Sequence, residues 1–243
     1  MIDRAQSFDR TAEEYERTRP DYPDAILDAI PLGPAATVVD VGAGTGKLTR
    51  VLAGRYERVI AVEPLDGMRV VLERAVPAVT ALKGTAEELP LPDGSADGVF
   101  AAQAFHWFRK DVALPEIARI LRAGGVFAVV WNGPDERRPS PLPPDFAAAL
   151  ESLHDAAPQP WLEEPEWEEL VEGSGLFTDV HRRTSVPHDH VLDRAAILEN
   201  LRTISWIATR DDRDEVFARL AAMLPDGTYA IPNLAYVIWA VRT

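Results

Sequence analysis

The fold is decided by the stretch Thr37-Val38-Val39-Asp40-Val41-Gly42-Ala43-Gly44-Thr45-Gly46-Lys47-Leu48. A buried apolar run passes here through three alternating glycines into the start of a helix, as in a parallel strand followed by a tight turn. A second apolar run, Val59-Ile60-Ala61-Val62, ends at Glu63 and predicts the neighbouring strand. The sequence therefore predicts a doubly wound α/β domain, with the glycine turn and Glu63 at the carboxyl ends of adjacent strands.

The glycine spacing narrows the kind of ligand that this turn can hold. A dinucleotide-binding fingerprint reads G-x-G-x-x-G, whereas here the third glycine comes one residue early and Lys47 stands in its expected place. Gly42 and Gly44 lack a Cβ and can bring the backbone close to a ligand, while Gly46 opens the helix. With Glu63 placed where a ribose can lie, the turn predicts a nucleoside site without a good pyrophosphate cradle.

Five ordered segments between Thr37 and Asn132 resemble the class I S-adenosylmethionine (SAM) dependent methyltransferases. The segments are Asp40 with Gly42 to Gly46, Glu63, Thr85-Ala86-Glu87, Ser95-Ala96-Asp97-Gly98-Val99-Phe100 and Arg119-Ile120-Leu121-Arg122-Ala123-Gly124-Gly125. The resemblance implies a Rossmann-like, doubly wound, seven-stranded mixed sheet, completed by an antiparallel pair of strands. It also implies an N-terminal helical arm and a helical cap inserted before the last strand.

The same resemblance implies that SAM is the cofactor and S-adenosylhomocysteine (SAH) the product. Glu63 matches the acid that binds the ribose diol, and the loop Thr85 to Glu87 matches the one beside the adenine. The cofactor contacts expected from it are Tyr15, Arg19, Asp40, Gly42, Ala43, Gly44, Gly46, Glu63, Pro64, Met68, Thr85, Ala86, Glu87 and Gln103.

Two further strings resemble the type 11, trans-aconitate methyltransferase-like subgroup, whose members act on small molecules. The first is Tyr15-Glu16-Arg17-Thr18-Arg19-Pro20-Asp21-Tyr22-Pro23, which resembles a segment that folds over the cofactor. On this analogy Tyr15 and Arg19 reach the SAM carboxylate; the alternative is simple helix packing. The second string, Gln103-Ala104-Phe105-His106-Trp107-Phe108, follows the fourth strand, and there Gln103 is expected to hold the methionine part of SAM.

Aromatic residues predict the acceptor side of the site, where a ring can stabilise a sulfonium through cation–π contacts. The expected pocket residues are Tyr22, Phe105, His106, Trp107, Trp131 and Trp206. His106 is the single catalytic candidate, and its alternative is a structural role beside two aromatics. A base helps if the acceptor is a hydroxyl or an amine, whereas an ionised carboxylate needs none, and both cases stay open.

Composition favours a small-molecule acceptor over nucleic acid, because the net charge is −14 and the pI about 4.8. The chain has no cysteine, which excludes a disulfide scaffold and a thiolate metal site. His188-Asp189-His190 lacks a third ligand nearby, so no metal site is predicted. The polar start and the lack of a membrane-length apolar run predict a cytoplasmic protein. The sequence leaves open whether it is a monomer or a homodimer.

Hydrophobic periodicity predicts strands near 37–41, 58–63, 79–83, 97–103 and 125–131, with helices between them. Helical stripes include Met68 to Ala75, Leu114 to Leu121 and, after Asp193 as an N-cap, Ile197 to Ala208. A strand is expected from Phe177 to Pro187, a helix through Val216 to Leu224, and a last strand from Leu234 to Val241. The predicted parts are an arm at 1–35, a SAM-binding core at 36–133, and a linker, cap helices and final strand pair at 134–243.

The function predicted from these features is methyl transfer from SAM to a small molecule by in-line displacement. Two other classes stay open. A nicotinamide-dependent oxidoreductase is compatible with Glu63 but not with the glycine spacing, and a non-catalytic SAM-binding regulatory module would carry the same cofactor motifs. The arm and the residues between Val191 and Gly227 are expected to form a movable lid.

Overall fold

The computed structural model describes residues 12–156, 167–208 and 210–243. Residues 1–11 of the predicted arm, and the acidic residues Glu163, Glu164 and Glu166, lie outside these ranges. The strands are β1 Thr37–Val41, β2 Arg58–Val62, β3 Thr80–Leu82, β4 Ala96–Ala102, β5 Leu121–Pro134, β6 Phe177–Asp193 and β7 Thr228–Arg242. The helices are α2 Ala12–Thr18, η1 Asp24–Ala29, α3 Lys47–Arg55, α4 Asp66–Ala75, η2 Phe105–Trp107, α5 Lys110–Ile120, α6 Pro144–Asp155, α7 Trp167–Gly173, α8 Arg194–Arg202, α9 Ser205–Ala208 and α10 Arg213–Met223.

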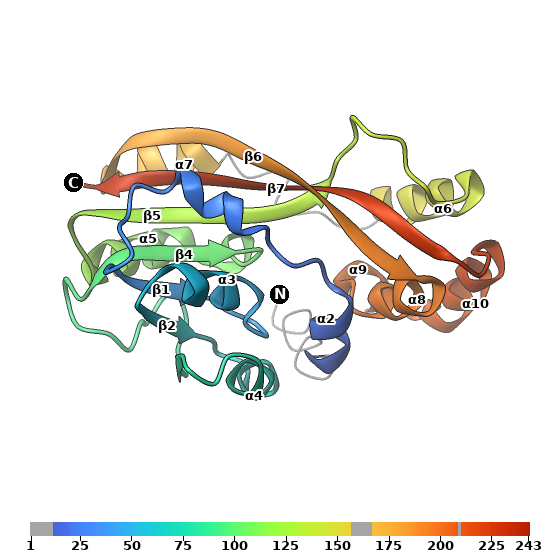
Figure 1. Cartoon of the computed structure of the whole chain (residues 1–243), viewed down its shortest axis with the longest axis horizontal. Coiled ribbons are helices and arrows are strands. Elements are labelled where there is room, and N and C mark those ends of the chain that lie inside the picture. The colour runs from blue at the N-terminus through green and yellow to red at the C-terminus, as the bar shows by residue number, and fades with distance from the viewer. Residues whose placement is uncertain (1–11, 157–166, 209) are drawn as a thin grey trace. The chain divides into compact units, whose positions relative to one another are not determined.

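The seven strands form one sheet in the order β3-β2-β1-β4-β5-β7-β6. The pairs β1–β2, β1–β4, β2–β3 and β4–β5 are parallel, with Val39 opposite both Ile60 and Val99. The arrow of β7 points opposite to those of β5 and β6, so the last strands close the sheet in antiparallel fashion (Figure 1). The predicted mixed sheet is confirmed. Its order reverses between β1 and β4, and ligands of open α/β sheets bind at the carboxyl ends of strands beside such a reversal.

The chain divides into two compact units, which we describe separately. The core unit contains residues 21–132, 167–186 and 235–243, and the helical unit contains residues 12–20, 133–156, 187–208 and 210–234. Strands β6 and β7 each contribute residues to both units.

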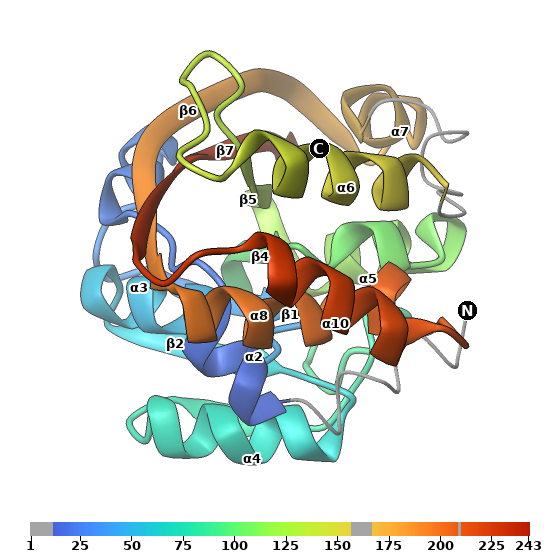
Figure 2. The same cartoon turned by 90° about the vertical axis from the view of Figure 1, so that its right-hand side faces the viewer.

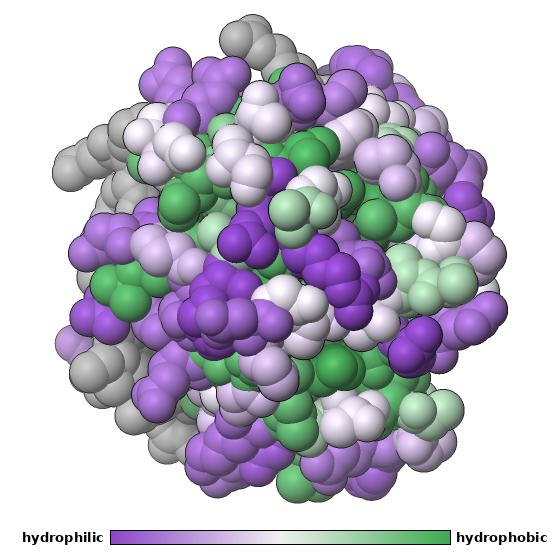
Figure 3. Space-filling model, turned by 90° about the vertical axis from the view of Figure 1, so that its left-hand side faces the viewer, coloured by the Kyte–Doolittle hydropathy of each residue, from purple (hydrophilic) through white to green (hydrophobic). Residues whose placement is uncertain are grey.

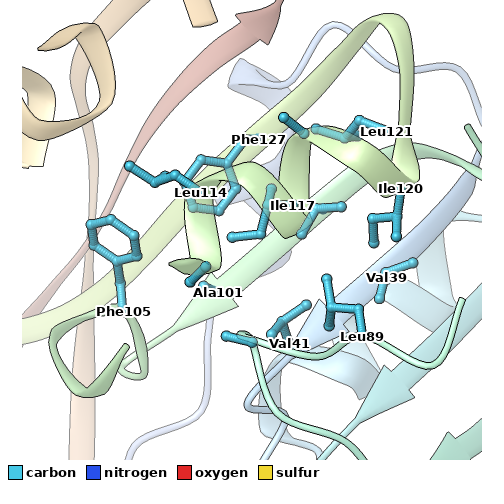
Figure 4. Packing of buried hydrophobic residues seen from close by; sticks show 14 of the residues in the cluster. Val39, Val41, Leu89, Ala101, Phe105, Leu114, Ile117, Ile120, Leu121 and Phe127 are labelled. Atoms are coloured by element: carbon cyan, nitrogen blue, oxygen red, sulfur yellow. The ribbon is translucent and has the colours of Figure 1, made fainter. Parts of the chain in front are cut away.

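Two apolar layers form the interior of the core unit, because successive residues of a strand point to opposite faces. In β5, Phe127 and Val129 belong to one cluster, and Val126, Ala128 and Val130 belong to the other. The first cluster holds the buried stripe of α5, and Figure 4 shows the α5 side chains lying among those of the strands. The second cluster packs η1 and α3 on the other face. A continuous apolar run such as that of β5 is what a strand covered on both faces requires.

The helical unit has a separate apolar cluster built from α6, α8, α9 and α10 together with residues of β6 and β7. Helix α10 contacts both α6 and α8, and α2 contacts α8 (Figure 2). Helix α8 begins as predicted, since Asp193 accepts a hydrogen bond from the Ala196 amide at 2.8 Å. Its predicted stripe to Ala208 is divided, however: α8 ends at Arg202 and the short α9 follows.

Two boundaries differ from the prediction for identifiable reasons. Leu121 was assigned to a helical stripe, but α5 ends at Ile120, and Leu121 pairs with Ala96 as the first residue of β5. Strand β6 runs on past Pro187 to Asp193, so the segment His188 to His190 is strand and not a strand-to-loop junction. Both errors arise because pairing with a distant strand is not visible in local periodicity.

The strands β4 and β5 begin at the end of the core unit opposite to the glycine turn. Figure 3 looks onto this face, where hydrophilic residues are interspersed with apolar ones. Asp97 at the start of β4 accepts a hydrogen bond from the Thr37 amide at 2.8 Å and pairs with Arg122. These contacts join the starts of β1, β4 and β5, so Asp97 has a structural role at the end opposite to the predicted site.

Candidate active site

The glycine turn after β1 has left-handed backbone at all three glycines, with φ of +69° at Gly42, +58° at Gly44 and +92° at Gly46. A Cβ on Gly42 would lie 2.7 Å from Cβ of Ala104, so this glycine allows the turn to pack against the end of β4. A Cβ on Gly44 would meet no atom within 4 Å among the residues that the structure describes. Gly44 therefore borders open space, as the predicted close approach of a ligand requires.

Glu63 fastens this turn to the end of β2. Glu63 is 4% exposed, and Oε2 of its carboxylate accepts a hydrogen bond from the Gly44 amide at 2.8 Å. Oε1 accepts a second hydrogen bond, from the Leu65 amide at 2.9 Å. Because carboxylate oxygens can each accept more than one hydrogen bond, these contacts orient Glu63 and still allow it to bind a hydroxyl. The structure thus brings Gly44 and Glu63 together at the switch point of the sheet.

Asp40 lies beneath the turn and is completely buried. Its Oδ2 accepts a hydrogen bond from the Thr49 hydroxyl at 2.6 Å, and Oδ1 has no hydrogen-bond partner among the residues that the structure describes. Burial raises the pKa of Asp40 to about 7; the Thr49 hydrogen bond opposes this shift and the nearby Glu63 carboxylate adds to it. Asp40 therefore supports the turn from below and holds a proton more strongly than an ordinary aspartate.

This shift predicts a pH dependence of stability. Asp40 keeps its proton in the folded protein up to about pH 7, whereas the carboxyl of the unfolded chain releases it near 3.8. The unfolded state binds fewer protons in this window, so the free energy of unfolding should fall as pH rises from about 4 to about 7, by the order of 4 kcal/mol from this group. Asp40→Asn should remove that part of the slope. Urea unfolding of both proteins at pH 5 and pH 8 measures it, and equal slopes would contradict the assignment.

The next cofactor residues predicted in the core unit follow β1, β2 and β3. Pro64 is exposed and Met68 is buried in the first turn of α4. The loop after β3 has exposed Thr85 and buried Ala86, and Glu87 accepts a hydrogen bond from the Arg109 amide at 2.8 Å. Ala43 donates its amide to the Val62 carbonyl at 3.2 Å. Apart from Met68, these residues lie in the loops that follow the parallel strands, the end of the sheet where the site is expected.

Gln103 has an unusual backbone at the end of β4, with φ of +52°. Left-handed backbone is uncommon for residues other than glycine. Where it occurs, surrounding contacts hold it in place, and such residues cluster at functional sites. Here the Gln103 amide donates to the Val130 carbonyl at 3.0 Å, and its side-chain Nε2 donates to the Asn132 carbonyl at 2.7 Å. Gln103 is thus fixed between the ends of β4 and β5.

Aromatic residues after β4, in β5 and in α7 form a chain of ring contacts. The His106 ring lies 4.8 Å from Trp107 and 5.0 Å from Trp131, and Trp131 lies 4.9 Å from Trp167 of α7, all between ring centroids. Trp167 was not predicted, because its helix is more than 30 residues away in sequence and only the fold brings it there. Phe105 has no exposed surface and belongs to the core cluster, so its placement does not favour contact with a ligand.

His106 is surrounded by these rings and is neutral at pH 7. Burial lowers its pKa to about 4, and the nearby Lys110 ammonium contributes. A neutral imidazole can accept a hydrogen bond from an acceptor hydroxyl or amine, but with this pKa it is a weak base. Tyr22 is buried in the other apolar cluster, with the residues of η1.

Three predicted residues belong to the helical unit. The Arg19 guanidinium donates to Oγ1 and to the carbonyl of Thr203, each at 3.0 Å, and its Cζ lies 5.2 Å from the centroid of the Tyr15 ring. Arg17 pairs with Glu199. Helix α2 is therefore fastened to α8 and the turn after it, which matches the packing alternative for Arg19. Trp206 lies against His154 of α6, with ring centroids 5.6 Å apart.

Among residues 12–156, 167–208 and 210–243, no group of three or more metal-ligating side chains is arranged to hold an ion. Asp189, from the His188 to His190 string, instead pairs with Arg138 at 2.6 Å. The helices in the same ranges are too short or too polar to cross a bilayer.

The chain is similar in sequence to known methyltransferases. Residues 39–129 match the family described as methyltransferase domain. An uncharacterized methyltransferase of Mycobacterium tuberculosis is 49% identical over 135 residues, which are 56% of this chain and 56% of that protein. Trans-aconitate 2-methyltransferase of Azoarcus is 32% identical over 162 residues, 64% of this chain and 62% of that enzyme. The chain thus matches little more than half the length of these curated relatives.

A solved structure of similar fold supports the same assignment. A proposed type II methyltransferase of Anaeromyxobacter dehalogenans superposes with a TM-score of 0.60 at 26% identity, covering 92% of this chain and 97% of that one. The matched residues 39–129 include β2, β3, β4 and most of β1 and β5, with the glycine turn, Glu63 and Gln103 between them. This chain therefore contains a methyltransferase domain and has the class I methyltransferase fold.

Proposed function

We propose that the protein transfers a methyl group from SAM to a small-molecule acceptor by in-line displacement. The observation that carries this proposal is the junction of β1 and β2, where open space at Gly44 adjoins the buried carboxylate of Glu63. Within a methyltransferase domain, this junction offers a close backbone approach and an acid for a ribose. The third glycine of the turn comes one residue earlier than in the dinucleotide fingerprint, which weighs against a nicotinamide cofactor.

The residues of the core unit fit SAM. A Cβ on Gly44 would occupy the open space that we assign to the ligand, and the Glu63 carboxylate lies at the turn, complementary to a cationic ligand. When bound, SAM supplies an activated methyl group on a sulfonium. The protein then has to orient the donor and exclude water, tasks that we assign to the glycine turn, Glu63, Gln103 and the rings of Trp107 and Trp131.

The acceptor side is assigned to the ring cluster around His106. Its neutral imidazole can accept a hydrogen bond from a hydroxyl or amine acceptor and so orient the attacking atom. The net charge of −14 and the likeness to an enzyme named for trans-aconitate support the proposal of a small-molecule acceptor. We assign no acceptor by name, because these contacts suit more than one.

Turnover with methyl-labelled SAM tests the proposal. Incubation with panels of small hydroxyl, amine and carboxylate acceptors should transfer label to at least one class. Binding of SAM without any transfer would favour the regulatory module. Reduction or oxidation of a substrate with NAD in place of SAM would contradict the proposal.

We further propose that the N-terminal segment and the cap helices act together as a lid. The structural support is internal to the helical unit, where Arg19 binds Thr203 and Arg17 pairs with Glu199. Segments fastened in this way should become protected together. Amide hydrogen exchange should therefore slow at residues 12–23 and 194–208 when SAH is added. Protection at the Gly42 turn alone would contradict the lid.

A further inference from the structure

Two of the points at which the chain passes between the two units are joined by a hydrogen bond. It enters the core unit after Pro20 and leaves it after Asn132, so Asp21 and Asn132 are the core residues at these two crossings. Asn132 is buried, and its Nδ2 donates to the main-chain carbonyl of Asp21 at 3.2 Å. One side chain thus joins two crossings that are 111 residues apart in sequence.

Both crossings are also joined to the candidate donor site. Lys47, the residue after the glycine turn, donates from Nζ to Oδ1 of Asp21 at 2.9 Å. Gln103, at the end of β4, donates from Nε2 to the carbonyl of Asn132 at 2.7 Å. The contacts therefore run from the β1 turn through Asp21 and Asn132 to the end of β4, with Arg50 of α3 as an additional partner of Asp21 at 3.5 Å.

Two residues of this network, Lys47 and Gln103, have local arrangements that would be energetically unfavourable without the contacts of the network. The Lys47 side chain is 9% exposed and begins a helix, where the helix dipole disfavours a positive charge and burial removes hydration. Asp21 offsets both effects. Gln103 has left-handed backbone, which a residue with a Cβ rarely adopts without surrounding contacts to hold it. These costs indicate that the network, and not local preference, maintains the arrangement.

We propose that Asn132, Asp21 and Lys47 are positioning residues that form a latch at the two crossings. The latch holds the segments that lead into the helical unit in register with the glycine turn and Gln103. Occupancy of the donor site is then transmitted to both segments through Lys47 and Gln103. This ligand-dependent part rests on the proposed function, whereas the latch itself is a property of the ligand-free protein.

Hydrogen exchange of the ligand-free protein tests the latch directly. Asn132→Leu keeps a branched side chain of similar size but removes the amide that donates to Asp21. Exchange should rise about tenfold in residues 17–24 and in residues 131–136 together, because each segment loses its contact with the other. Asp21→Asn changes a mostly exposed side chain and keeps the main-chain carbonyl, so it should fold even if Asn132→Leu does not. It should raise exchange in the same two segments about threefold.

The matched control is Ser95→Ala, which also removes a side-chain hydrogen bond to a main-chain carbonyl, that of Pro92 at 2.7 Å. It lies before the start of β4, at the other end of the sheet, and should leave both segments unchanged. A rise confined to the neighbourhood of the substituted residue, or no rise, would overturn the latch. A wild-type protein that does not bind SAH would instead count against the proposed function, and the ligand-free comparison would still decide the latch.

A second experiment, with SAH added, distinguishes a positioning role of Asn132 from a general structural role. If the latch transmits occupancy, Asn132→Leu should bind SAH within about threefold of wild type and keep the protection of the Gly42 turn. The protection that SAH gives to residues 12–20 should then fall at least fivefold. Undiminished protection of residues 12–20 would overturn the transmission.

Discussion

Gly44→Val is expected to abolish detectable SAH binding while the protein stays folded. A Cβ here would meet no atom of the described residues within 4 Å, and the two methyl groups of valine would extend from it into the space assigned to the ligand, so the clash should fall on the ligand. Valine at φ of +58° also carries backbone strain of about 1–2 kcal/mol, which lowers stability but leaves most of a typical folding free energy. Calorimetric titration with SAH, beside a thermal melt, measures both effects.

The chain offers a matched control for this substitution. Gly94 has nearly the same backbone, with φ of +57°, and a Cβ there would also meet nothing within 4 Å. It lies in the turn before β4, at the end of the sheet away from the candidate site. Gly94→Val should therefore show a similar loss of thermal stability with normal SAH affinity. Equal SAH affinity in the two variants would remove Gly44 from the ligand site.

The second large effect is expected at Glu63. Glu63→Ala should weaken SAH binding by about 1.5–3 kcal/mol, or roughly 10- to 150-fold, because a charge-assisted hydrogen bond to the ribose is lost. The substitution also removes the acceptor of the Gly44 and Leu65 amides, so some loosening of the turn contributes. Calorimetry on the folded variant gives the size of the loss.

Asp66 provides the comparison for Glu63. It is an exposed acid three residues further along, paired with Arg69 and Lys83, and it makes the same change in net charge when replaced by alanine. Asp66→Ala should leave SAH affinity within about twofold of wild type, since exposed pairs contribute little and are screened by salt. If Asp66→Ala weakened SAH binding as much as Glu63→Ala, the loss would report the overall electrostatic field of the protein and not a specific contact.

The parts of the fold that the sequence predicted are those with strong local signals. The run Thr37 to Val41 and the alternating glycines predicted β1 and its turn, because burial on both faces demands a continuous apolar strand. The Asp193 cap of α8 was likewise visible, since an N-cap needs only its own side chain and an amide three residues on. Local chemistry also suggested Glu63, which ends a strand.

The parts that were missed depend on contacts between distant residues. Trp167 joins Trp131 only because α7 packs on the sheet, and Asn132 meets Asp21 across 111 residues. Phe105 was expected at the pocket because it stands beside His106 in sequence. A short 3-10 helix, η2, turns successive side chains in different directions, so Phe105 enters the core while His106 faces Trp131. Sequence spacing within such a turn does not reveal which residue points inward.

The central claim, that the β1 glycine turn binds SAM, is tested most directly by calorimetric titration of the wild-type protein with SAH, SAM and NAD in turn. We predict saturable binding of SAH and SAM at one site per chain, no heat from NAD, and no SAH binding after Gly44→Val. Binding of NAD without SAH, or SAH binding that survives Gly44→Val unchanged, would contradict the account.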